Sequence, residues 1–115
     1  MKKSHTGWIR NGGKYNYPED SHFDWTSFRG AGQAHAVETA LKRLRQEEFA
    51  EDIDTARMAV HYREFGSRRE LRIRWIIDFA WRGASEITPG LWAQGYQVVV
   101  DPETGVVVEA SAYER

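Results

Sequence analysis

The segment from Leu71 to Arg82 alternates between apolar and mostly polar or small residues over twelve positions, and this pattern constrains the fold more than any other feature of the chain. Successive side chains of a β-strand point to opposite faces of a sheet, so the pattern predicts a long strand with one buried face. The apolar series consists of Leu71, Ile73, Trp75, Ile77, Phe79 and Trp81.

A second alternating segment lies just before this strand and predicts a hairpin. Met58, Val60 and Tyr62 alternate with other residues, and a turn at Gly66–Arg69 connects the two segments. Pairing Gly66 with Arg69 brings the two apolar faces into coincidence. The predicted opposite pairs are Tyr62 with Ile73, Val60 with Trp75, and Met58 with Ile77.

The C-terminal part of the chain predicts another hairpin. Two β-branched runs, Val98–Val100 and Val106–Val108, flank a turn that contains Pro102 and Gly105. Proline suits a type I turn, and glycine suits the left-handed position that follows it. The predicted opposite pairs are Val100 with Val106, Val98 with Val108, and Tyr96 with Ala110.

A helical period precedes the strands. Ala34, Val37, Leu41 and Leu44 recur at spacings of three and four, which places them on one helix face. The Asn11-Gly12 pair within residues 8–17 favours a short N-terminal hairpin.

These elements predict a single α+β domain over residues 1–115. One main helix at about residues 31–50 packs on a curled antiparallel meander of four strands. The aromatic-rich residues 1–30 pack on this body. The predicted strands span about 56–65, 70–82, 92–101 and 105–113.

The order of helix, long strand with a central Trp, loop and terminal hairpin resembles the cystatin-like group of small α+β domains. That group includes larger cone-shaped relatives of the nuclear-transport-factor-two type. The segment Gly95–Val107, with its Asp101-Pro102-Glu103-Thr104-Gly105 turn, resembles the last hairpin of such bacterial domains. Some of these are immunity proteins, so the resemblance implies either a protein-binding role or a ligand pocket between helix and sheet.

Composition excludes several classes of site. The chain has no Cys, so it can form neither a disulfide nor a thiolate metal site. Its four His show no ligand spacing typical of a metal site, and no nucleophile or phosphate-binding motif is present. We therefore expect no metal, no cofactor and no catalytic residue. The apolar runs are too short to span a bilayer, and we expect a cytoplasmic protein without a membrane partner.

His61 and Asp78 form one candidate acid–base pair, because a His and an Asp on neighbouring strands can transfer protons. In the predicted register, however, His61 faces Arg74 and Asp78 faces Arg57. This register favours a structural ion pair between strands, so we predict that His61 and Asp78 are not catalytic.

Arginine accumulates in the first hairpin, where seven Arg stand against three acidic residues between Arg57 and Arg82. The predicted register opposes Arg63 to Arg72 and His61 to Arg74, and such like-charged pairs favour an anionic neighbour. We therefore predict a partner-binding surface. Its residues are Arg63, Arg72, Arg74, His61 and Arg82.

Three functions fit these features. The first is a non-catalytic protein-binding module, such as a small inhibitor or an immunity-type protein that masks a partner with an acidic surface. The second is a small enzyme or ligand-binding domain with a pocket. The third, less favoured because the net charge is −1, is a single-stranded nucleic-acid binder. These features also fit a homodimer formed through the sheet.

Overall fold

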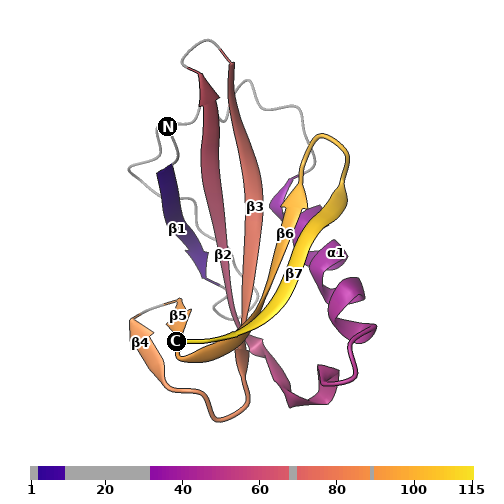
Figure 1. The fold of residues 1–115 in the computed structure, drawn as a ribbon, viewed down its shortest axis with the longest axis vertical. Coiled ribbons are helices and arrows are strands. Elements are labelled where there is room, and N and C mark those ends of the chain that lie inside the picture. The colour runs from indigo at the N-terminus through magenta and orange to yellow at the C-terminus, as the bar shows by residue number, and fades with distance from the viewer. Residues whose placement is uncertain (1–2, 10–31, 68–69, 89) are drawn as a thin grey trace.

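The computed structural model describes residues 3–9, 32–67, 70–88 and 90–115, and every structural statement below concerns these parts of the chain (Figure 1). For residues 3–9, 64–67, 70 and 71 only the backbone is described. They form one α-helix and several antiparallel strands, so the predicted α+β class is confirmed. The elements are β1 (Lys3–Ile9), α1 (Gln33–Arg45), the 3-10 helix η1 (Ala50–Asp52), β2 (Ile53–Ser67), β3 (Glu70–Trp81), β4 (Glu86–Thr88), β5 (Leu91–Trp92), β6 (Gln94–Asp101) and β7 (Val106–Glu114).

Five strands form the main sheet in the order β1-β2-β3-β6-β7, and β4 and β5 form a separate two-stranded sheet. Helix α1 lies against one face of the main sheet (Figure 1) and contacts β3, β6 and β7. Trp8 and Ile9, the first residues of the predicted N-terminal hairpin, belong to β1 and pair with Val60 and Ala59 of β2. The rest of that hairpin, and the predicted packing of residues 10–30, lie outside the described residues.

The face of the sheet that contacts α1 carries the main core, and we call it the inner face. Trp75 lies at its centre, and its ring meets that of Tyr62 edge-on with centroids 6.4 Å apart. Val37 and Leu44 of α1 are buried in this core, as their period predicts. The buried residues that β-strands contribute here are Ile53, Met58, Val60, Tyr62, Ile73, Trp75, Ile77, Phe79, Tyr96, Val98 and Val100.

The buried stripe of α1 differs from the predicted one. Ala36 and Ala40 are fully buried, whereas Ala34 is exposed and Leu41 is only partly buried. Alanine has a side chain of one carbon, so a helix face that carries it can approach a sheet closely. The stripe is therefore rotated towards the alanines.

The register between β2 and β3 differs by two residues from the prediction. Ser67 pairs with Glu70, and the core residues pair as Tyr62 with Trp75, Val60 with Ile77, and Met58 with Phe79. A shift of two residues leaves every side chain on the same face, so the apolar pattern cannot distinguish the two registers. The predicted faces of these residues hold, but the predicted partners are wrong.

The register between β6 and β7 also differs from the prediction, by one residue beside the turn, where Asp101 pairs with Val106, and by one more residue beyond a β-bulge in β7. Val100 pairs with Val107 and Val98 pairs with Ala110, so Val108 is the extra residue. Gly105 has the predicted left-handed backbone: its φ is 72°, and its N–H donates to the Asp101 carbonyl at 2.7 Å.

The opposite face of the sheet, which we call the outer face, is largely buried, although the sequence predicts a polar face here. Ile76, Asp78 and Val99 are each less than 5% exposed. Trp92, at the end of β5, packs against Ala59 and Ala80 on this face. The sheet therefore has a second buried layer, and its position decides which polar residues can meet solvent.

Candidate functional site

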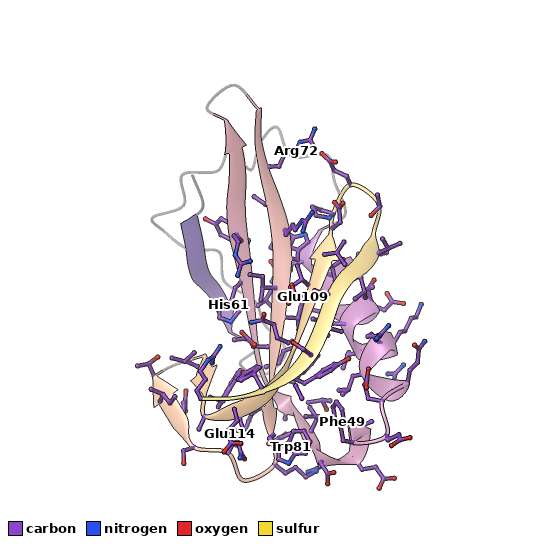
Figure 2. The ribbon with its side chains drawn as sticks, in the orientation of Figure 1. Phe49, His61, Arg72, Trp81, Glu109 and Glu114 are labelled. Carbon is purple, nitrogen blue, oxygen red and sulfur yellow. The ribbon has the colours of Figure 1, made fainter. Side chains whose placement is uncertain are left out.

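Three of the five predicted partner-binding residues lie together on the outer face. Arg63 of β2 pairs directly with Arg74 of β3, and Arg72 lies two residues along the same strand. Residues two apart in a strand share a face, so the three guanidinium groups project from the same side. We call Arg63, Arg72 and Arg74 the arginine cluster. Figure 2 shows Arg72 near the hairpin end of the sheet, far from Trp81.

The cluster contains one direct opposition of like charges, between Arg63 and Arg74. The predicted oppositions of Arg63 to Arg72 and of His61 to Arg74 are wrong, because of the two-residue register shift. Arg72 and Arg74 are exposed and Arg63 is half-buried. Arg72 Nε lies 3.7 Å from Glu103 Oε1 in the β6–β7 turn, a contact between two exposed side chains.

The other two predicted residues do not belong to this cluster. Arg82 lies beyond the opposite end of β3, where its Nε donates to the Glu51 carbonyl at 2.7 Å and its backbone N–H to the Asp52 carbonyl at 2.7 Å. The His61 side chain is only 11% exposed. Neither residue can therefore contribute a freely accessible cation beside the arginine cluster.

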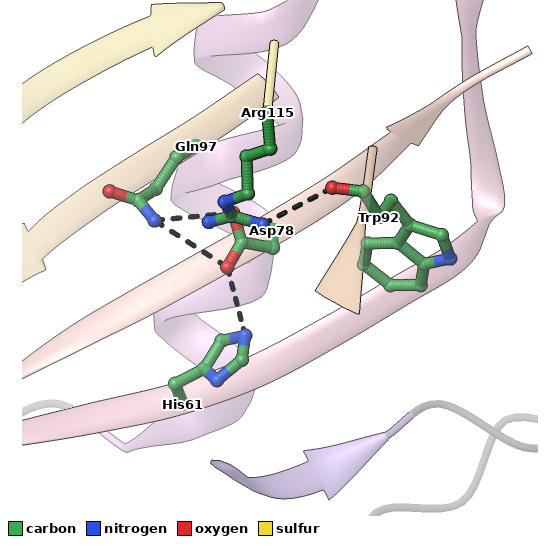
Figure 3. Close-up of polar contacts among 5 residues, drawn as sticks. All are labelled: His61, Asp78, Trp92, Gln97 and Arg115. Atoms are coloured by element: carbon green, nitrogen blue, oxygen red, sulfur yellow. Dashed lines mark hydrogen bonds and ion pairs between the residues drawn. The ribbon is translucent and has the colours of Figure 1, made fainter. Parts of the chain in front are cut away.

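His61 instead joins a buried polar network that spans three strands (Figure 3). Its Nε2 lies 2.9 Å from Asp78 Oδ2. Gln97 of β6 pairs with Asp78 across the strands, and its Nε2 donates to Asp78 Oδ1 at 3.2 Å. The predicted pairing of Asp78 with Arg57 is wrong: Asp78 pairs with Ala59, and Arg57 donates to the Ala84 carbonyl at 2.7 Å. The network gives a nearly buried carboxylate one close imidazole neighbour and one hydrogen-bond donor.

Tyr113 of β7 lies beside this network. Burial, and then the negative charge of Asp78, raise the pKa of the Tyr113 hydroxyl above its ordinary value. Its ring covers Gly95, where an added Cβ would lie 2.6 Å from Tyr113 Oη and in conflict with the Phe79 carbonyl. Only glycine therefore allows the backbone and the ring to approach this closely.

His61 and Asp78 have the separation of an acid–base pair, but little of either side chain is accessible to solvent. Asp78 is 4% exposed in its side chain. Two cavities lined by described residues lie elsewhere on the molecule. One lies at the end of the inner face beside Trp81, and the other lies between α1 and the start of β7. The prediction that His61 and Asp78 are not catalytic stays a prediction.

Other sites find little support among the described residues. In residues 3–9, 32–67, 70–88 and 90–115 no cluster of His, Asp and Glu side chains has the arrangement of a metal site. Within the same part of the chain, no helix has the length and apolar character needed to cross a bilayer.

Comparison with protein-family models, with curated proteins and with solved structures found no significant match to this chain. The resemblance to cystatin-like domains therefore stays a prediction.

Gln97 and Tyr113 were not among the residues predicted to lie at a site. Gln97 carried a signal, because it is a polar residue within an otherwise apolar strand, at the position that alternation assigns to the outer face. Tyr113 carried none, since its position depends on the β7 bulge.

Proposed function

We propose that this protein is a non-catalytic protein-binding module whose arginine cluster contacts an acidic surface of a partner protein. Such a module would act as a small inhibitor or an immunity-type protein. The observation that carries the proposal is the gathering of Arg63, Arg72 and Arg74 on one face at one end of the sheet.

The distribution of charge over the molecule supports this role. Acidic residues gather around η1, at the end of the sheet where β2 begins (Figure 1). They are Glu47, Glu48, Glu51 and Asp52. The longest extent of the molecule is 42 Å, and the arginine cluster lies towards its other end. A local cluster of like charges can orient a molecule as it approaches an oppositely charged partner, even when its net charge is close to zero.

Arginine also has the right chemistry for this contact. Its planar guanidinium group presents a fork of N–H donors that binds a carboxylate through two parallel hydrogen bonds. Arg is enriched at the energetically dominant positions of protein interfaces. The Arg72–Glu103 contact, at 3.7 Å between exposed groups, is weak enough to be exchanged for a partner carboxylate.

A small enzyme is the second candidate, and the 2.9 Å contact between His61 and Asp78 is the observation that favours it. The burial of both side chains favours the binding module instead.

The test uses charge reversal in the full chain. A partner is first isolated with the tagged protein and identified, and its association with the purified protein is then measured over a range of NaCl concentrations. Replacing Arg72→Glu and Arg74→Glu together should slow association about tenfold and reduce its dependence on salt. The matched control reverses Lys42 and Arg45, two exposed cations of α1, and should leave association nearly unchanged.

Three results would contradict the proposal. One is equal loss in both double variants. Another is a complex in which the arginine cluster stays exposed to solvent. The third is tight, salt-sensitive binding of random single-stranded DNA that Arg72→Glu and Arg74→Glu abolish, which would favour the nucleic-acid function instead.

A further inference from the structure

The end of the inner face beyond α1 contains a groove of about 440 Å³. Helix α1 ends at Arg45, so it does not extend over the last row of side chains on the sheet. Ala80 of β3 pairs with Gly95 of β6, so Trp81 comes next to Gln94 at this end of the sheet. Gln94 in turn pairs with Glu114 of β7. The groove is lined by Trp81, Gln94, Ala112, Tyr113 and Glu114.

One wall of this groove is a packed aromatic group. The rings of Phe49 and Trp81 lie with centroids 5.3 Å apart and tilted by 33°. Phe49 also meets the ring of Tyr96 edge-on, again at 5.3 Å. Figure 2 shows Phe49 beside Trp81. Trp81 packs against Phe49, remains partly exposed and lines the groove.

The opposite wall carries a negative charge. Glu114 is the only charged residue among the five that line the groove. The neighbouring cations have other partners: Arg82 donates to the Glu51 carbonyl, and Arg115 donates to the Trp92 carbonyl at 3.2 Å. The Arg115 guanidinium also lies 4.3 Å from the centre of the Tyr113 ring. Among the described residues, therefore, no cation forms an ion pair with Glu114.

We propose that this groove binds a substituted ammonium group. A cation over the face of an indole is attracted by the negative charge of the ring face, and tryptophan is the strongest partner of this kind. A carboxylate on the other side of the groove adds a charge of the matching sign. Pockets of about 300 Å³ or more hold small ligands. An anion would be repelled by Glu114, and a neutral apolar ligand would gain nothing from it.

This site lies at the end of the molecule away from the arginine cluster, so it is independent of the proposed function. The protein would then have a cationic surface at one end and a cation-binding groove at the other.

The experiment titrates the full chain with choline and, separately, with 3,3-dimethylbutan-1-ol, which has the same shape without the charge. Binding is followed by NMR through the indole N–H signal of Trp81, assigned from its loss in Trp81→Phe. Choline should shift this signal and the backbone amide signal of Glu114 in a saturable way. The neutral analogue should bind about tenfold more weakly or not at all.

Glu114→Gln should weaken choline binding about tenfold, whereas Glu109→Gln, an exposed glutamate on the same strand, should not change it. The double variant at Arg72 and Arg74 should bind choline normally, which separates this proposal from the proposed function. A peptide carrying trimethyllysine is a further arm: tighter binding than choline assigns the cation to a protein side chain, and weaker binding assigns it to a free small molecule. Equal affinity for the neutral analogue, or unchanged affinity in Glu114→Gln, would overturn the proposal.

Discussion

The two faces of the central sheet are both largely buried, but different interactions stabilise them. The inner face is apolar throughout its core, where Trp75 and its neighbours pack against the alanine-rich stripe of α1. The outer face combines apolar residues with the network of His61, Asp78 and Gln97. An apolar face gains stability from area removed from water, whereas a buried carboxylate is tolerated only while its hydrogen bonds are kept.

This difference bears on how the strands find their partners. The apolar pattern of the inner face fits equally well in registers two residues apart. The polar network fits only one of them, since Asp78 must lie opposite Gln97 and diagonal to His61. Buried polar groups can specify register in this way at some cost in stability, and we hypothesise that this network does so.

The largest effect is expected on the inner face. Trp75→Ala should lower the free energy of unfolding by about 4 kcal/mol, because it removes a large buried ring and leaves a cavity. Denaturation in urea measures this loss through the unfolding midpoint. Val106→Ala, which truncates an exposed side chain, is the control and should change little. An unchanged midpoint in Trp75→Ala would contradict the helix-on-sheet packing.

On the outer face, Asp78→Ala should cost about 3 kcal/mol, because it leaves the partner groups buried without the carboxylate. Asp78→Asn keeps the size of the side chain and should cost less. Replacing His61 and Asp78 together by Leu and comparing the double variant with the single ones isolates their coupling energy. Additive effects of the two replacements would show that the pair has no special role.

The outer face should also respond to alkaline pH. The raised pKa of Tyr113 favours its neutral form in the folded protein, so this contribution is fully present below the unfolded value of about 10 and is lost as pH rises above it. Tyr113→Phe lacks this dependence. The free energy of unfolding of the original protein should therefore fall relative to that of Tyr113→Phe above about pH 10. Parallel pH curves for the two proteins would contradict the placement of Tyr113.

The smallest effect is expected at the exposed β6–β7 turn. Glu103→Gln removes the exposed contact with Arg72 and should change the free energy of unfolding by less than about 0.5 kcal/mol. Urea denaturation at low and high salt measures it. A loss as large as that of Asp78→Ala would mean that the hairpin end is as tightly held as the outer face.

The same contrast explains what the sequence could predict. The inner face was predictable, because the alternation of residues such as Ile73, Trp75 and Ile77 is a local pattern that directly reports burial. The outer face was not, because its cover includes Trp92, whose contacts with Ala59 and Ala80 join distant parts of the chain. Because the sequence does not show this cover, it predicts that Asp78 faces solvent.

The candidate site was predicted in part for a related reason. A shared face follows from spacing alone, so Arg63, Arg72 and Arg74 were correctly grouped. Their individual partners depend on register, which the sequence left undecided. Arg82 was misplaced because alternation does not show where a strand ends and its backbone turns towards η1.

The strand order has a consequence for how the chain folds. β2 and β3, and likewise β6 and β7, are joined by short turns, and hairpins of this kind form in about 1–10 μs. β1 must instead find β2 across the intervening helix, with Ile9 pairing with Ala59. Closing a long loop costs entropy that no local contact offsets, so such pairing is slow. We expect β1 to join the sheet last during refolding, and its amide hydrogens to exchange with solvent before those of β3.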